Sequence, residues 1–141
     1  MRALILAVLL AGCAGSAPFV REQPVPGKGV IYVYRLWKFF GAGFTREAAL
    51  THMGSGQMRK FPLRVGKYVV TVADPGRTMF SIPGPEGEGQ NLMIDLAPGS
   101  TVFIRCDFAS GWLLNGFKCS QVAPEQGEYE VPNCRRNVMG D

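Results

Sequence analysis

Short runs of alternating β-branched and aromatic residues, separated by glycine and proline, make up most of this chain. The clearest run covers residues 30–36, where Ile31 and Val33 fall on one face and Tyr32 and Tyr34 on the other. A period of two bounded by turn residues is typical of a strand. Similar runs occupy residues 68–73, 77–82, 91–96, 100–107 and 117–122. The pattern predicts an all-β domain, a single small antiparallel β-sandwich with room for one short helix.

Turn residues suggest how some of these segments pair. Residues 91–96 and 100–107 flank Ala97-Pro98-Gly99 and are expected to form a hairpin. The segment 45–53 is ambiguous, because Thr45 is a good helix N-cap and helix formers follow it. Ala48, Leu50 and His52 also alternate with Ala49, Thr51 and Met53, and Gly54-Ser55-Gly56 would turn the chain into residues 57–61. We favour a strand that begins this second hairpin.

The N-terminus has the features of an export signal. Arg2 precedes an uncharged apolar run over residues 3–11, which is far shorter than the roughly 20 residues that cross a bilayer. The run ends in Leu10-Ala11-Gly12-Cys13, which resembles the lipobox of bacterial lipoproteins. This resemblance implies removal of residues 1–12 and attachment of lipid to Cys13; the alternative is an ordinary signal peptide with an incidental cysteine. Ala14 replaces the aspartate that commonly retains lipoproteins at the inner membrane, which implies the outer membrane.

A segment rich in proline and small residues follows the cysteine. Residues 14–27 have no apolar period and are expected to be an extended, flexible tether. At full extension this tether would span roughly 45 Å. The expected organisation is therefore a signal peptide over residues 1–12, a lipidated cysteine and tether over 13–28, and a β-sandwich with a C-terminal tail over 29–141.

A longer motif carries a family resemblance. Residues 26–35, PGKGVIYVYR, followed by the turn and strand VGKYVV over residues 65–70, resemble an uncharacterised family of bacterial lipoproteins with a domain of unknown function. The layout is also similar to PEGA-type modules over residues 26–107, so the expected sandwich is PEGA-like or transthyretin-like. The resemblance implies fold and location only.

Charge and histidine content limit which kinds of binding or catalytic site the chain can form. The formal net charge is +4, but the adjacent basic pairs are confined to Arg59-Lys60 and Arg135-Arg136, so we expect no nucleic-acid partner. His52 is the single histidine, which excludes metal sites built on two or three imidazoles. We expect no metal, no cofactor and no catalytic residue, with His52 a surface residue beside a turn. A catalytic group that combines His52 with Cys134 or a serine stays open, because such groups are defined by geometry.

Three cysteines follow Cys13 in a chain expected to enter an oxidising compartment. Cys106 and Cys119 lie on neighbouring predicted strands and are the expected disulfide. Cys134 would then be free, and the positive charges of Arg135 and Arg136 would favour its thiolate. A disulfide between Cys119 and Cys134 that holds the tail is the alternative.

An aromatic segment over residues 37–44 is the candidate contact surface. Its aromatic residues are Trp37, Phe39, Phe40 and Phe44. They either cap the open end of the sandwich or form an exposed patch that contacts a protein or a membrane. The basic residues Arg35, Lys38 and Arg46 around them would suit an anionic lipid surface.

Together these observations predict a lipid-anchored outer-membrane protein that faces the periplasm. We expect a non-enzymatic binding or accessory module, with the membrane and an envelope protein as partners. One alternative is an envelope inhibitor or a peptidoglycan- or carbohydrate-binding protein, although an inhibitor of a basic lysozyme would usually be acidic. A Cys/His enzyme is the other alternative.

Overall fold

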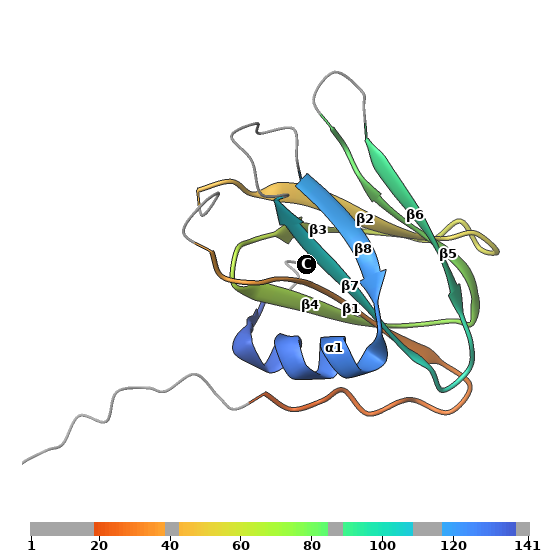
Figure 1. The fold of residues 1–141 in the computed structure, drawn as a ribbon. Coiled ribbons are helices and arrows are strands. Elements are labelled where there is room, and N and C mark those ends of the chain that lie inside the picture. Colours follow the sequence, from red (N-terminus) through yellow and green to blue (C-terminus); the bar gives the residue numbers. More distant parts are fainter. Residues whose placement is uncertain (1–18, 39–42, 85–88, 109–116, 138–141) are drawn as a thin grey trace, which may run out of the picture.

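Two β-sheets pack face to face in the computed structural model, which describes residues 19–38, 43–84, 89–108 and 117–137 (Figure 1). One sheet has five strands in the order β8-β7-β1-β4-β9, and the other has four in the order β3-β2-β5-β6. The strands are β1 Gly29–Arg35, β2 Arg46–His52, β3 Met58–Leu63, β4 Lys67–Ala73, β5 Gly76–Ile82, β6 Gln90–Leu96, β7 Thr101–Phe108, β8 Phe117–Val122 and β9 Arg135–Arg136. The predicted all-β sandwich is confirmed.

The core lies between the sheets, where the alternation of each strand sends one set of side chains inward. Ile31 and Val33 of β1 meet Phe80 and Ile94 of the opposite sheet, and all four are fully buried. The sandwich is closed along its sides because β3 lies next to β4 and β6 next to β8. In the described part of the chain, the interior therefore opens towards the ends of the strands.

The other face of β1 is buried as well. Tyr32 and Tyr34 lie in a second cluster on the outer face of the five-stranded sheet, which is covered by helix α1 (Pro124–Glu130) and by residues 19–28 (Figure 1). A short 3-10 turn, Val131–Asn133, follows α1 and places Val131 in this cluster. The segment expected to be a C-terminal tail is thus a structural layer of the domain.

Residues 19–28 belong to this layer too, so the expected tether is shorter than predicted. The Phe19 ring packs against the rings of Tyr32 and Tyr68, with centroids 6.2 and 5.6 Å apart. The amide of Glu22 donates to the Tyr32 hydroxyl over 2.7 Å, and Arg21 pairs with a helix carboxylate. Because residues 14–18 alone separate Cys13 from Phe19, a lipid on Cys13 would lie within roughly 20 Å of the domain.

The predicted hairpin over residues 91–107 is wrong. The turn at 97–99 carries the chain from one sheet to the other: β6 pairs with β5, whereas β7 pairs in parallel with β1 and antiparallel with β8. Burial explains this arrangement. β7 places Phe103 and Ile104 on opposite faces and both are buried, so it suits the centre of a sheet, whereas β6 alternates with exposed residues and lies at an edge.

The ambiguous segment is a strand. Residues 46–52 form β2, which pairs antiparallel with β3 after the turn at 54–56, as the alternation predicts. Gly56 has φ of +70°, a conformation that glycine adopts without strain. No helix in the described ranges is long and apolar enough to span a lipid bilayer.

Candidate functional site

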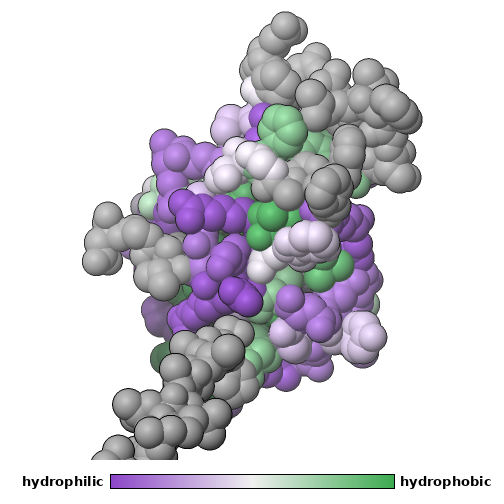
Figure 2. All heavy atoms as spheres, turned by 90° about the vertical axis from the view of Figure 1, so that its left-hand side faces the viewer, coloured by the Kyte–Doolittle hydropathy of each residue, from purple (hydrophilic) through white to green (hydrophobic). Residues whose placement is uncertain are grey.

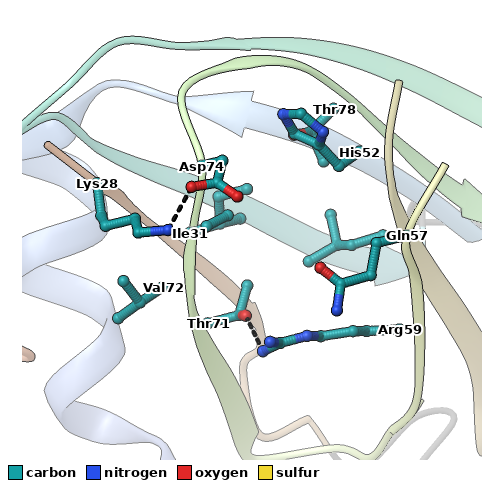
Figure 3. A pocket seen from close by; sticks show the side chains of 11 residues that line it. Lys28, Ile31, His52, Gln57, Arg59, Thr71, Val72, Asp74 and Thr78 are labelled. Carbon is teal, nitrogen blue, oxygen red and sulfur yellow. Dashed lines mark hydrogen bonds and ion pairs between the residues drawn. The ribbon is translucent and has the colours of Figure 1, made fainter. Parts of the chain in front are cut away.

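A polar pocket opens between the two sheets at the end of the sandwich where β1 begins and β2 ends (Figure 3). Its volume is about 130 Å³. Ile31 and Leu50 form an apolar inner wall, and both are buried. Polar and charged side chains surround this wall, and they include Lys28, His52, Arg59, Thr71, Asp74 and Thr78.

The pocket is polar because several strands place an inward-facing polar residue near the same end of the sandwich. In β2 the series is Ala48, Leu50 and His52, and in β3 it is Leu63, Phe61 and Arg59. In β4 and β5 the corresponding polar residues are Thr71 and Thr78. These strands come from both sheets, so only the packing of the sheets brings the four polar residues together.

Arg59 is held in place by a buried hydroxyl. Its Nη1 donates to Oγ1 of Thr71 over 2.9 Å, and Thr71 is itself 6 % exposed (Figure 3). Among the residues that the structure describes, no carboxylate lies within ion-pair distance of the guanidinium. Arg59 therefore keeps hydrogen-bond donors available at the mouth of the pocket.

Lys28 and Asp74 form an ion pair at the rim (Figure 3). The hydrogen bond from the Lys28 ammonium lowers the pKa of Asp74 below its ordinary value, so this carboxylate is charged at neutral pH. Lys28 and Asp74 balance each other, while Arg59 has no such partner. The lining of the pocket thus carries one positive charge in excess.

His52 is half-buried beside the turn at 54–56, and both of its ring nitrogens are used within the protein. Nδ1 accepts a hydrogen bond from the Ser55 amide over 3.1 Å, and Nε2 lies 3.2 Å from the carbonyl oxygen of Pro75. This pattern assigns the neutral tautomer with the proton on Nε2. The hydrogen bonds join the β2–β3 turn to the loop before β5, so His52 shapes the pocket wall.

The structure does not bring His52 and Cys134 together. His52 lines the pocket, whereas Cys134 lies in the cluster on the outer face of the five-stranded sheet, where its thiol contacts the Arg35 carbonyl oxygen at 3.6 Å. Burial, with a smaller effect of Glu130, raises the pKa of Cys134 to about 11. The expectation that Arg135 and Arg136 favour its thiolate is therefore wrong, because desolvation of the buried thiol dominates.

The expected disulfide is present. Cys106 of β7 and Cys119 of β8 face each other in the strand register and are bonded, and both are buried in the core between the sheets. Cys134 is free. Cys13, the expected lipid attachment site, lies outside the described residues.

The described parts of the aromatic segment, residues 37–38 and 43–44, lie at the end of the sandwich opposite to the pocket. Trp37 is 67 % exposed and Phe44 47 % exposed, while Phe39 and Phe40 lie outside the described residues. The Phe44 ring contacts that of Phe108, with centroids 6.1 Å apart. Figure 2 faces this side of the molecule and shows hydrophobic surface between hydrophilic residues.

Two of the basic residues expected around this patch have other roles. Arg35 is 1 % exposed and points into the sandwich, where its guanidinium lies 5.2 Å from the ring centres of Phe108 and Phe117. It donates to the Phe44 carbonyl oxygen over 2.6 Å, and burial lowers its pKa. Lys38 pairs with Asp107.

No group of three or more histidine, cysteine, aspartate or glutamate side chains that could hold a metal ion occurs in the described part of the chain. Compared with known proteins, the chain matches no family model, no curated protein sequence and no solved structure.

Sequence reasoning missed the pocket. It placed Ala48, Leu50 and His52 on one face of a strand, which was the available signal, because a polar residue ending an apolar series marks the point where the core meets solvent. Arg59 was noted only as half of a basic pair, although alternation turns Arg59 inward and leaves Lys60 on the outer face near Glu47. The partners of these residues come from other strands, so their meeting point depends on the packing.

Proposed function

We propose that this protein is a lipid-anchored outer-membrane protein that faces the periplasm, and that its β-sandwich is a binding module rather than an enzyme. The lipobox-like sequence ending at Cys13 supports the anchor. This sequence carries the proposal, and the attachment of residues 19–22 to the domain then limits how far the domain can lie from a lipidated cysteine. The hydrogen bonds that occupy both nitrogens of His52 favour binding over acid–base catalysis at the pocket.

The same attachment supports one orientation of the anchored domain. Phe19 packs on Tyr68, which lies opposite Tyr34 near the end of β1, whereas residues 19–28 run towards Lys28 at the start of β1 (Figure 1). The anchored end of the segment is therefore on the same side of the molecule as Trp37. A tether over residues 14–18 would hold this side close to the bilayer and leave the polar pocket facing the periplasm.

Exposed aromatic residues at that end suit contact with a lipid surface. Trp37 and Phe44 expose apolar rings, and tryptophan favours the boundary between lipid and water because its ring is amphipathic. Phe39 and Phe40 belong to the same stretch of sequence. We assign Trp37, Phe39, Phe40 and Phe44 as the membrane-contact segment of the anchored protein.

Anchoring also explains how weak binding could suffice. A module confined to the membrane surface meets other envelope proteins at a high effective concentration, so its intrinsic affinity can be modest. The partner would be an envelope component within reach of the pocket end.

The first experiment tests the anchor itself. Protein purified from a bacterial host that processes lipoproteins should begin at Cys13 with the added mass of diacylglycerol and an acyl chain, and it should fractionate with the outer membrane. Cys13→Ser should lose both properties while keeping the fold by circular dichroism. A wild-type protein without lipid that leaves with the soluble periplasmic fraction would refute the proposal.

A second experiment tests the orientation. The chain has two tryptophans, so in Trp112→Phe the remaining tryptophan fluorescence comes from Trp37. In vesicles that contain brominated lipids, the fluorescence of the anchored Trp112→Phe protein should be quenched. The same variant with Cys13→Ser, mixed with the same vesicles, is the matched control and should be quenched less. Unquenched Trp37 in the anchored protein would contradict the orientation and leave the anchor unaffected.

A further inference from the structure

We infer that the polar pocket binds a small monoanion with a short apolar group, of the kind presented by the terminal carboxylate of a peptide that ends in a small apolar residue. The inference rests on the proposed function as a binding module, and it specifies what the module binds.

Charge selects a monoanion. The ionised groups of the lining are Lys28, Arg59 and Asp74, and Lys28 is already paired with Asp74. The excess positive charge belongs to Arg59, which has no carboxylate within ion-pair distance in the described ranges. One bound carboxylate balances this charge, whereas a phosphate dianion would leave a negative charge in excess.

Donor geometry favours a carboxylate. A guanidinium presents its N–H groups in a planar fork that matches the two oxygens of a carboxylate. One of these donors binds Oγ1 of the buried Thr71, which restricts the orientation of the group before any ligand arrives. Arg59 is thus a binding residue, and Thr71 is a positioning residue that acts through it.

Size and wall composition define the rest of the ligand. A pocket of about 130 Å³ is well below the roughly 300 Å³ at which drug-sized ligand sites begin, so it suits a terminal group rather than an extended polymer. Leu50, which is 5 % exposed, and the half-buried Ala73 offer an accessible apolar wall next to the charged rim. A methyl-sized side chain beside the carboxylate can contact this wall while Arg59 binds the oxygens.

The probe that tests the inference is N-acetylalanine, with the neutral N-acetylalaninamide as its control. The full chain, 15N-labelled and in detergent micelles, is titrated with each compound while backbone amide shifts are recorded. N-acetylalanine should shift amides around residues 28, 50–59 and 71–78 with a dissociation constant of roughly 1–10 mM. The amide should shift them at least about tenfold more weakly.

Variants then assign the binding to Arg59. Arg59→Gln should weaken N-acetylalanine binding at least about tenfold, and Arg59→Lys should restore only part of it. Arg77→Gln is the matched control, because Arg77 carries the same charge on β5 of the same sheet but pairs with Asp95 at the surface. Thr71→Val should weaken binding less than Arg59→Gln, and its effect should disappear in the Arg59→Gln background.

Each outcome decides the inference. Absence of shifts at the pocket, equal binding of the acid and its amide, or equal effects of Arg59→Gln and Arg77→Gln would overturn it. Tighter binding of inorganic phosphate than of N-acetylalanine would replace the carboxylate with a phosphate ligand and so overturn it as well. Because binding is measured in micelles, failure here is independent of the anchor, which the Cys13→Ser fractionation tests.

Discussion

Gly127 of α1 lies directly on the ring of Phe103 in β7: a Cβ built at residue 127 would stand 2.1 Å from Cγ of Phe103. Gly127 is the buried residue of the helix, and the Phe103 ring stacks in turn on that of Tyr32, with centroids 5.1 Å apart. The helix therefore packs closely on the sheet because residue 127 has no side chain.

The first prediction is that Gly127→Ala destabilises the domain by about 1–3 kcal/mol, because the helix or the Phe103 ring must move. The sign of this stability change is informative, because by helix propensity alone alanine would stabilise the helix by about 1 kcal/mol relative to glycine. Urea unfolding measures the change, and Glu125→Ala at an exposed helix position is the control, with little effect expected. A more stable Gly127→Ala protein would contradict the observed packing.

Arg35 should resist replacement even by lysine. Its guanidinium lies near two aromatic rings and donates to a backbone carbonyl, a planar arrangement that an ammonium group cannot reproduce. We expect Arg35→Lys to lower the free energy of unfolding by about 1–3 kcal/mol. Arg46→Lys, at a half-buried position nearby, should change it by less than about 0.5 kcal/mol. Equal effects of the two substitutions would argue against a specific role for the Arg35 guanidinium.

The disulfide should contribute substantially to stability. It closes a short loop, with a sequence separation of 13 between Cys106 and Cys119, for which chain entropy suggests about 3 kcal/mol. The double variant Cys106→Ala/Cys119→Ala should be less stable by this order in urea unfolding. Reductant should lower the free energy of unfolding of the wild type by a similar amount and leave that of the double variant unchanged. A further loss of stability in the reduced double variant would show that the reductant acts at another site.

Cys134 should be unreactive at neutral pH. Burial raises its pKa to about 11, so little thiolate exists at pH 8, and iodoacetamide should label the folded protein much more slowly than the urea-unfolded protein. The raised pKa also makes stability depend on pH, because folding favours the protonated thiol. The thiol therefore contributes its full stabilisation below the ordinary thiol pKa near 9. This stabilisation is lost as pH rises through about 11. Burial raises the pKa of Tyr34 as well, which acts in the same direction.

Unfolding measured between pH 8 and pH 11 should therefore show stability falling with pH. The slope should be smaller in Cys134→Ala, in which the thiol is absent. Rapid labelling of folded wild type at pH 7, or equal slopes in the two proteins, would contradict the assignment.

Two threonine hydroxyls are buried without a hydrogen-bond partner in the described structure, those of Thr51 and Thr78. Replacing either with valine keeps the shape and removes an unsatisfied group, so the free energy of unfolding should stay the same or rise by up to about 1 kcal/mol. Thermal unfolding of the two variants beside the wild type checks this. A loss of stability at either position would reveal a partner for that hydroxyl.

The local sequence pattern was sufficient to predict a strand and its pairing where the partner strand is close in the sequence. The alternation of β2 and the glycines at 54–56 predict a strand and a hairpin, and the turn leaves little choice of partner. The Cys106–Cys119 bond was favoured over Cys119–Cys134 for a similar reason, because its two strands follow each other in the chain. The helix at 124–130 was missed because an interior glycine lowers helix propensity, and only the Phe103 ring explains why a glycine is needed there.

The amino-acid sequence by itself determined the all-β class and the strand faces and favoured the Cys106–Cys119 pairing, since period, turn residues and short separations act within a local segment. Packing in three dimensions decided what depends on distant partners: the parallel pairing of β1 with β7, the layer formed by residues 19–28 and α1, and the burial of Arg35 and Cys134. It also decided the pocket, because His52, Arg59, Thr71 and Thr78 come from four strands in two sheets. Alternation tells which face each of these side chains takes, but only the stacking of the sheets sets which of them meet.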